Sequence, residues 1–136
     1  MRVDEIAHEP LELTTPAEPS ALAPIRRAVE AWLAEQEIDP TDGWQIVGAC
    51  HEACANAAEH AYRPVEAGTI EIEARRGGDR IVVTVRDHGR WRPPRGRDRR
   101  RGLTLMNYFM DSVDVERSEH GTTVRMERRL GGGFRA

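Results

Sequence analysis

The chain has 136 residues and a mass of 15.3 kDa, which predicts one domain spanning residues 1–136, with a core over about 5–130 and a tail at 131–136. Charged residues make up 32% of the composition and the net charge is −3, so capture of nucleic acid by bulk charge is disfavoured. No apolar run is long enough to cross a membrane, the N-terminus has no signal-peptide segment, and Cys50 and Cys54 form no disulfide framework. We therefore expect a cytoplasmic protein with buried, reduced thiols that binds neither nucleic acid nor membrane directly.

The first half of the chain predicts a strand and two helices. Residues 5–14 alternate partially and indicate an opening strand, which the segment 15–19 breaks. Apolar side chains recur every three or four residues over 20–36, as in an amphipathic helix. The turn at 39–42 supplies N-caps for a second helix over about 41–62, which is followed by a proline.

A hairpin and a basic loop are predicted next. Residues 69–74 and 80–86 have strand patterns, and the Gly-Gly-Asp sequence at 77–79 between them is typical of a tight antiparallel turn. Residues 90–101 hold seven arginines and almost no apolar side chain, which predicts a long loop. A short helix is expected over 102–110.

The C-terminal segment predicts a second hairpin. Residues 112–117 and 122–130 alternate, and a turn at 118–121 joins them. Three helices and about five mostly antiparallel strands indicate an α+β fold, a two-layer α/β sandwich with the helices on one face of the sheet.

Glu52 and Asn56 are the first candidate site residues. They are four apart in the second predicted helix, so both lie on one face of it. The amide oxygen of Asn56 is suited to bind a hard cation such as Mg²⁺, and the carboxylate of Glu52 is suited to take a proton. The spacing alone also fits an ordinary solvated helix face.

Asp87 and Gly89 are the second candidate feature, at the end of a predicted strand. A carboxylate there can accept a hydrogen bond from an exocyclic amine, and a glycine lets a flat ring approach the backbone. Asp87 could also simply end a strand in a turn, where Asp and Gly are common.

The basic segment that leads to Gly102 is the third feature. An exposed helix N-terminus at Gly102 would bind phosphate, and arginines before it would add charge-assisted bonds. The run could instead be solvated, or bind an acidic partner. Together the three features indicate a purine-nucleotide site that has neither a P-loop nor a G-x-G-x-x-G turn.

Four motifs in order resemble the ATPase superfamily of gyrase, heat-shock chaperones, histidine kinases and MutL: Glu52-x-x-x-Asn56-Ala57, Asp87-x-Gly89, Gly102-Leu103-x-Leu105-Met106 and Gly121-Thr122. The small size of the chain resembles that of the bacterial anti-sigma-factor serine kinases. The sequences of the segments 54–62, 109–115 and 121–124 resemble that family as well. The resemblance covers about Leu11 to Leu130.

The resemblance implies a histidine-kinase-like ATPase fold, with ATP and Mg²⁺ as cofactors and protein serine/threonine kinase activity. Asn56 would ligate Mg²⁺, and Glu52 would be the general base toward a serine hydroxyl. Asp87 would recognise adenine by accepting a hydrogen bond from its amino group. Further nucleotide contacts would come from Gly89 and Thr122 beside the adenine, and from a lid over the phosphates that includes Arg97, Arg99, Arg101, Gly102 and Leu103.

The resemblance also implies partners. The substrate would be a STAS-type anti-anti-sigma protein, the second client a sigma factor held inactive, and the chain a homodimer. One departure bears on the activity: the family commonly has Gly-x-Gly before the last helix, and this chain reads Arg100-Arg101-Gly102. A non-catalytic partner-switching regulator of the same fold, with weak or no nucleotide binding, therefore stays open as the alternative.

Overall fold

A computed structural model describes residues 9–58, 68–88 and 98–131, with the backbone alone for 98–103. The described elements are, in order, β1 (Leu11–Pro16), the 3₁₀ turn η1 (Pro19–Ala21), α2 (Leu22–Glu35), α3 (Pro40–Asn56), β2 (Thr69–Gly77), β3 (Arg80–Asp87), α4 (Asp98–Phe109), β4 (Ser112–Ser118) and β5 (Gly121–Arg129).

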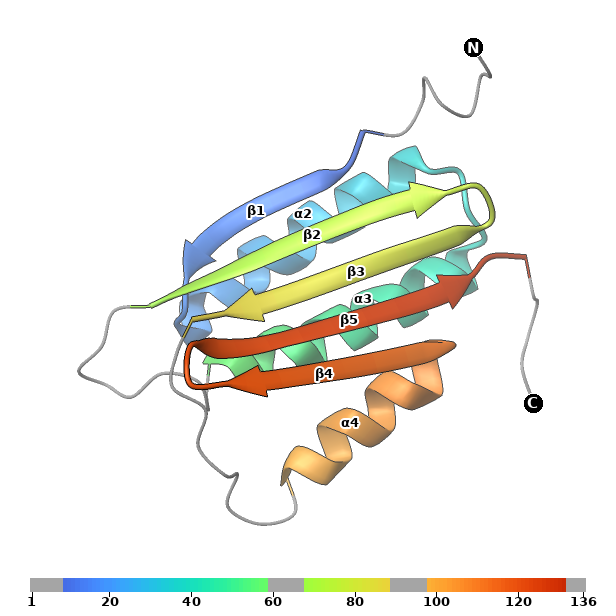
Figure 1. The fold of residues 1–136 in the computed structure, drawn as a ribbon. Coiled ribbons are helices and arrows are strands. Elements are labelled where there is room, and N and C mark those ends of the chain that lie inside the picture. Colours follow the sequence, from blue (N-terminus) through green and yellow to red (C-terminus); the bar gives the residue numbers. More distant parts are fainter. Residues whose placement is uncertain (1–8, 59–67, 89–97, 132–136) are drawn as a thin grey trace.

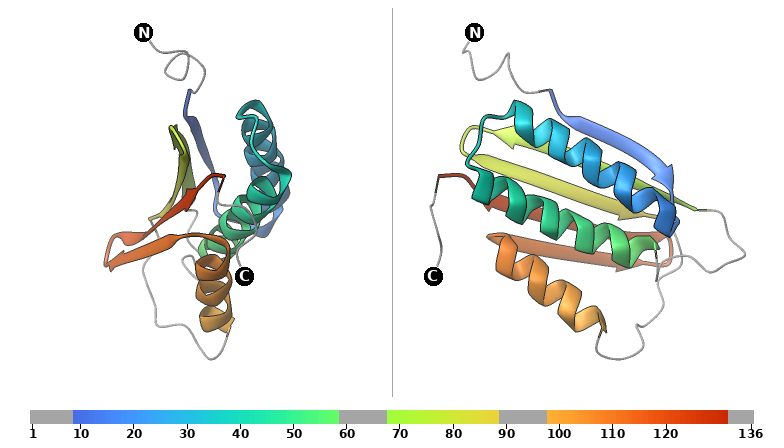
Figure 2. Two further views of the ribbon diagram at one scale, coloured as in Figure 1. Left: turned by 90° about the vertical axis from the view of Figure 1, so that its right-hand side faces the viewer. Right: turned by 180° about the vertical axis from the view of Figure 1, so that it is seen from behind.

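The strands form one five-stranded sheet in the order β1-β2-β3-β5-β4, with every neighbouring pair antiparallel. The helices lie on one side of this sheet, with α2 and α3 side by side over it and α4 next to α3 (Figures 1 and 2). The expected α+β sandwich with helices on one face is confirmed. None of the helices in the described ranges is both long and apolar enough to span a membrane.

The core lies between the sheet and the helices because the central strands alternate. Ile70 and Ile72 in β2, and Val83 and Val85 in β3, are at most 2% exposed, whereas the side chains between them are exposed or half-buried. This period of two is that of a sheet with one buried and one wet face. Each fully buried Val or Ile contributes about 1.5–3 kcal/mol relative to an exposed one.

Both predicted hairpins are confirmed. β2 and β3 are joined at Gly78, which has φ +63°, and Asp79. A left-handed residue at this point is one that glycine adopts without steric cost. β4 and β5 are joined by the two residues between Ser118 and Gly121.

The first strand is placed differently from the expectation. Residues 5–8 lie outside the described residues, and β1 continues through Thr15 and Pro16 rather than breaking there. Pairing decides the boundary, because Thr15 aligns with Ile70 and Pro16 with Thr69 of β2. β1 is an edge strand, where proline is tolerated because no ladder bond is lost on the open side.

The first two helices match their predicted positions with adjusted ends. Asp39 caps α3, as expected, since its Oδ1 accepts the Thr41 N–H at 2.8 Å. α3 runs to Asn56, residues 57–58 continue it as a π-helical turn, and the rest of the predicted helix, 59–62, lies outside the described residues. Cys50 and Cys54 are both free and buried in α3, and a hydrogen bond to Cys50 together with burial raises the pKa of Cys54 well above its usual range.

The last helix begins earlier than expected. α4 starts at Asp98, so residues 98–101 are helical and Gly102 is the fifth residue of the helix. The prediction of loop up to residue 101 was wrong for these residues. It rested on charge, yet arginine is a good helix former, and an aspartate in the first turn is favourable to the helix dipole.

Candidate functional site

Asp87 is the last residue of β3 and is only 5% exposed. Strand alternation directs its side chain to the helix-covered face, as for Val83 and Val85. Its Oδ1 accepts the backbone N–H of Thr122, its register partner on β5, at 3.3 Å. Burying a carboxyl group is costly without such donors, and this hydrogen bond holds the Asp87 acceptor at the strand end on the helix-covered face of the sheet.

Gly121 allows the start of β5 to lie close to the backbone of Asp87. It has φ +143°, and a Cβ built on it would lie 2.0 Å from the carbonyl oxygen of Asp87. Any side chain at this position would therefore push the first residues of β5 away from the end of β3. Glycine is needed here for both its backbone conformation and its lack of a Cβ.

Replacing Gly121 by alanine is expected to lower the free energy of unfolding by about 1–3 kcal/mol, and to weaken any ligand binding that depends on Asp87. Urea denaturation measures the first effect. Gly77→Ala is the matched control, because a Cβ there would meet nothing within 4 Å. Equal stability of the two variants would contradict the steric role of Gly121.

Glu52 and Asn56 are both half-buried on α3. The residues beside them that face the core are small, namely Ala49, Ala53, Cys54 and Ala57, which lets α3 lie close to the sheet. α3 and β3 run in the same direction, so their C-terminal ends, at Asn56 and Asp87, lie at the same end of the molecule (Figure 1). The fold thus gathers three candidate residues at one end of the helix–sheet layer.

A metal at this end would depend on Asn56. Within the described ranges no group of three His, Cys, Asp or Glu side chains could hold a metal ion. A single carboxamide oxygen fits Mg²⁺ bound to a nucleotide, because this ion usually keeps several waters and takes only one or two protein ligands besides phosphate oxygens.

The lid residues are only partly described. Gly89 and Arg97 lie outside the described residues, and Arg99, Arg101, Gly102 and Leu103 are described as backbone within α4. The expectation that Gly102 stands at a helix N-terminus was wrong. The unpaired N–H groups of an α-helix belong to its first four residues, which here are 98–101.

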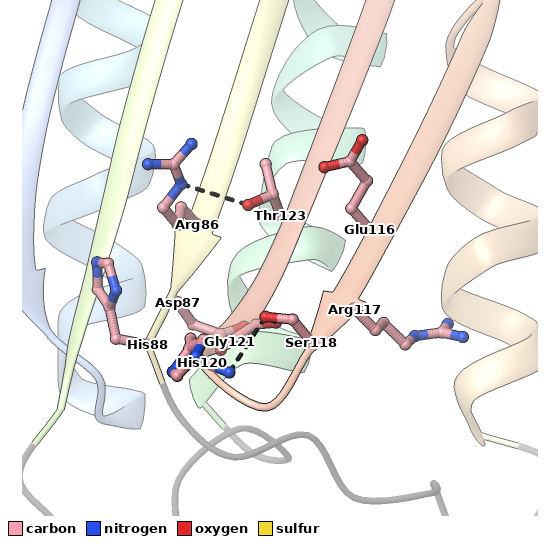
Figure 3. A pocket seen from close by; sticks show the side chains of 9 residues that line it. All are labelled: Arg86, Asp87, His88, Glu116, Arg117, Ser118, His120, Gly121 and Thr123. Carbon is pink, nitrogen blue, oxygen red and sulfur yellow. Dashed lines mark hydrogen bonds between the residues drawn. The ribbon is translucent and has the colours of Figure 1, made fainter.

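The sequence analysis did not predict a pocket that lies on the face of the sheet away from the helices. Figure 3 shows it at the ends of β3, β4 and β5. Arg86 donates from Nε to Oγ1 of Thr123 at 3.3 Å across its floor, and the Ser118 hydroxyl accepts the His120 N–H at 3.1 Å. Arg86 and Thr123 alternate with the helix-facing Asp87 and Thr122, so strand alternation could have placed them on this face.

The structure is an α+β sandwich with three candidate polar residues gathered at one end of its helix–sheet layer. The family model of the histidine kinase-like ATPase domain matches residues 15–128, and the chain belongs to this family. The match spans every described strand and helix except the first residues of β1 and the last residue of β5.

Named relatives agree with this assignment. The chain is 29% identical to the serine-protein kinase RsbW of Bacillus velezensis, over 90% of this chain and 86% of that protein. It is 31% identical to an anti-sigma F factor of Clostridium botulinum, over 88% of this chain and 92% of that protein. The family is therefore shared with proteins named as serine-protein kinases and as anti-sigma factors.

A solved structure is also similar. The crystal structure of the RsbU and RsbW domains of a Mycobacterium tuberculosis protein superposes with a TM-score of 0.76 at 30% identity. The match covers 90% of this chain and 32% of the other, so this chain spans about a third of the chain in that structure.

Proposed function

We propose that this chain is an ATP-dependent anti-sigma factor that phosphorylates a serine of a STAS-domain anti-anti-sigma protein and sequesters a sigma factor. The observation that carries the proposal is Asp87, a carboxylate held 5% exposed at the end of a central strand by the Thr122 N–H. The names of the relatives, serine-protein kinase and anti-sigma F factor, support the activity.

The nucleotide would bind at the C-terminal ends of α3 and β3. Asp87 accepts a hydrogen bond from the adenine amino group, with Gly89 and Thr122 beside the ring. A lid that includes Arg97, Arg99, Arg101, Gly102 and Leu103 would cover the phosphates. Asn56 would hold Mg²⁺, which would supply charge neutralisation at the phosphate oxygens.

Glu52 would act on the protein substrate. Its carboxylate accepts the proton of the serine hydroxyl as the serine oxygen attacks the γ-phosphorus and ADP leaves. Glu52 lies one helical turn before Asn56, so base and metal ligand face the same region. Such a reaction depends chiefly on positioning and electrostatic stabilisation.

The partners follow from this role. A STAS-domain protein and a sigma factor would compete for the chain in the cytoplasm, and a homodimer of this single ATPase domain would be the working unit. Neither nucleic acid nor a membrane is needed for such partner switching.

A non-catalytic regulator is the second candidate, and a specific observation favours it. Arg100 occupies the position of a glycine that the family commonly has, and α4 runs from Asp98 through Gly102. Helical backbone at this point leaves the Gly102 N–H inside the helix rather than available to phosphate. In this reading the chain would bind its partners without using ATP.

Calorimetric titration of ATP, with and without Mg²⁺, separates the two candidates. We expect wild type to bind ATP, Asp87→Asn to lose about tenfold or more in affinity, and Asn56→Ala to lose the dependence on Mg²⁺. Binding of a STAS-domain protein that is insensitive to nucleotide, together with no ATP binding by folded wild type, would favour the non-catalytic regulator.

A further inference from the structure

An aromatic patch stands at the junction of α3 and α4. Its members are Trp44 on α3, and Leu105, Tyr108 and Phe109 on α4. Trp44 is 68% exposed and Tyr108 is 71% exposed. Within the described ranges the exposed large hydrophobic side chains are Trp44, Leu105 and Tyr108, and all three are members of this patch. Clustered exposed aromatic side chains are the signature of a protein-binding surface.

Packing beneath the patch holds its rings in place. The Phe109 ring makes edge contacts with Trp44, at 5.5 Å between centroids, and with Tyr108, at 5.6 Å. Gly48 makes room for this ring, since a Cβ there would lie 2.9 Å from Cε2 of Phe109. Met106, 1% exposed, anchors the buried side of α4. A surface ordered in this way loses little conformational entropy when a partner binds.

The patch is continuous with the candidate catalytic face. Trp44, Gly48, Glu52 and Asn56 follow one another at intervals of four, and so belong to a single row of α3. The axial separation of Trp44 from Glu52 is about 12 Å, at 1.5 Å per residue. Phe109 lies over Gly48, between the two.

We propose that the aromatic patch is the docking surface for the protein whose serine is phosphorylated, an inference that rests on the proposed kinase function. A standard protein interface covers about 800 Å² on each partner, which is a disc of roughly 16 Å radius. A partner whose interface is centred on Glu52 therefore also covers Trp44. The substrate carries an apolar surface next to its acceptor serine, and the two exposed rings act as the anchors of the contact.

Steady-state kinetics test the proposal, with the STAS-domain protein that wild type phosphorylates as the probe. In Trp44→Ala and in Tyr108→Ala the KM for this protein is expected to rise about tenfold or more, while kcat and the affinity for ATP stay near wild type. Arg27→Ala, which removes an exposed side chain on α2, is the matched control and is expected to change nothing. Unchanged KM values in both aromatic variants would overturn the docking surface and leave the kinase intact.

Quenching of tryptophan fluorescence by acrylamide tests docking without requiring phosphate transfer. In a Trp91→Phe background the quenchable signal comes mainly from Trp44, because Trp32 is only 6% exposed. Protection of Trp44 on adding the STAS-domain protein supports docking even if no phosphate forms, in which case the kinase proposal alone fails. Absence of protection overturns the docking proposal. Light scattering that shows self-association of the chain, abolished by Trp44→Ala, overturns it too, because the patch would then join two copies.

Discussion

The Glu52→Ala variant is expected to phosphorylate a STAS-domain protein about 10²- to 10⁴-fold more slowly than wild type. The proposed reaction needs a base that takes the serine proton, and Glu52 is half-buried on α3, one turn from Asn56. Removing the carboxylate leaves the nucleotide contacts in place, so the loss is expected in kcat. Transfer of label from radioactive ATP to the STAS-domain protein, at saturating ATP, measures the rate.

Two controls separate a chemical role from a structural one. Glu30→Ala removes an exposed carboxylate on α2 and is expected to retain the wild-type rate. The affinity of Glu52→Ala for ATP is expected to stay within about threefold of wild type, because the base acts on the other substrate. A wild-type rate of transfer in Glu52→Ala would remove this residue from the reaction.

The Arg128→Ala variant is expected to lose about 3–5 kcal/mol of the free energy of unfolding. Arg128 and Asp42 form a buried ion pair, with side chains 4% and 5% exposed. The guanidinium donates to Oδ1 of Asp42 from Nε at 3.0 Å and from Nη2 at 2.7 Å. Its Nη1 also donates to the carbonyl oxygen of Phe109 at 2.5 Å, which connects β5 to the start of α3 and the end of α4.

The cost arises because truncation leaves an unpaired carboxylate inside the protein. Arg80→Ala is the matched control: Arg80 pairs with Glu127 at 2.9 Å but is 57% exposed, so its loss is expected to cost about 0–1 kcal/mol. Urea denaturation compares the two variants. A double variant, Asp42→Leu with Arg128→Met, is expected to recover most of the loss, since it removes both charges. Equal midpoints for Arg128→Ala and Arg80→Ala would contradict the buried-pair account.

Much of the fold was predictable because its signals are local. The alternation in residues 69–74 and 80–86, with Gly78 and Asp79 between them, specifies a hairpin without reference to the rest of the chain. The apolar spacing along α2 predicts a helix in the same way. The assignment to the histidine kinase-like ATPase family confirms the resemblance drawn from the ordered motifs.

The candidate site was predictable in part. The place of Asp87 at a strand end and the four-residue spacing of Glu52 and Asn56 identified these candidates. The fold brings the ends of their elements to one side of the molecule. Their chemical roles stay predictions. The start of α4 was mistaken because a run of arginines is compatible with both a loop and a helix, and contacts of α4 with α3 help decide between them.

Contacts between distant segments depended on the tertiary structure alone. Asp42 and Arg128 are 86 residues apart, and nothing local marks either as buried or paired. The same holds for Gly48, whose missing side chain admits Phe109, and for Gly121, whose backbone meets Asp87. Periodicity within a segment determines which face of an element is apolar, because it depends on neighbouring residues only. Which charge is neutralised, and which ring is left exposed, depends on how the segments meet in space.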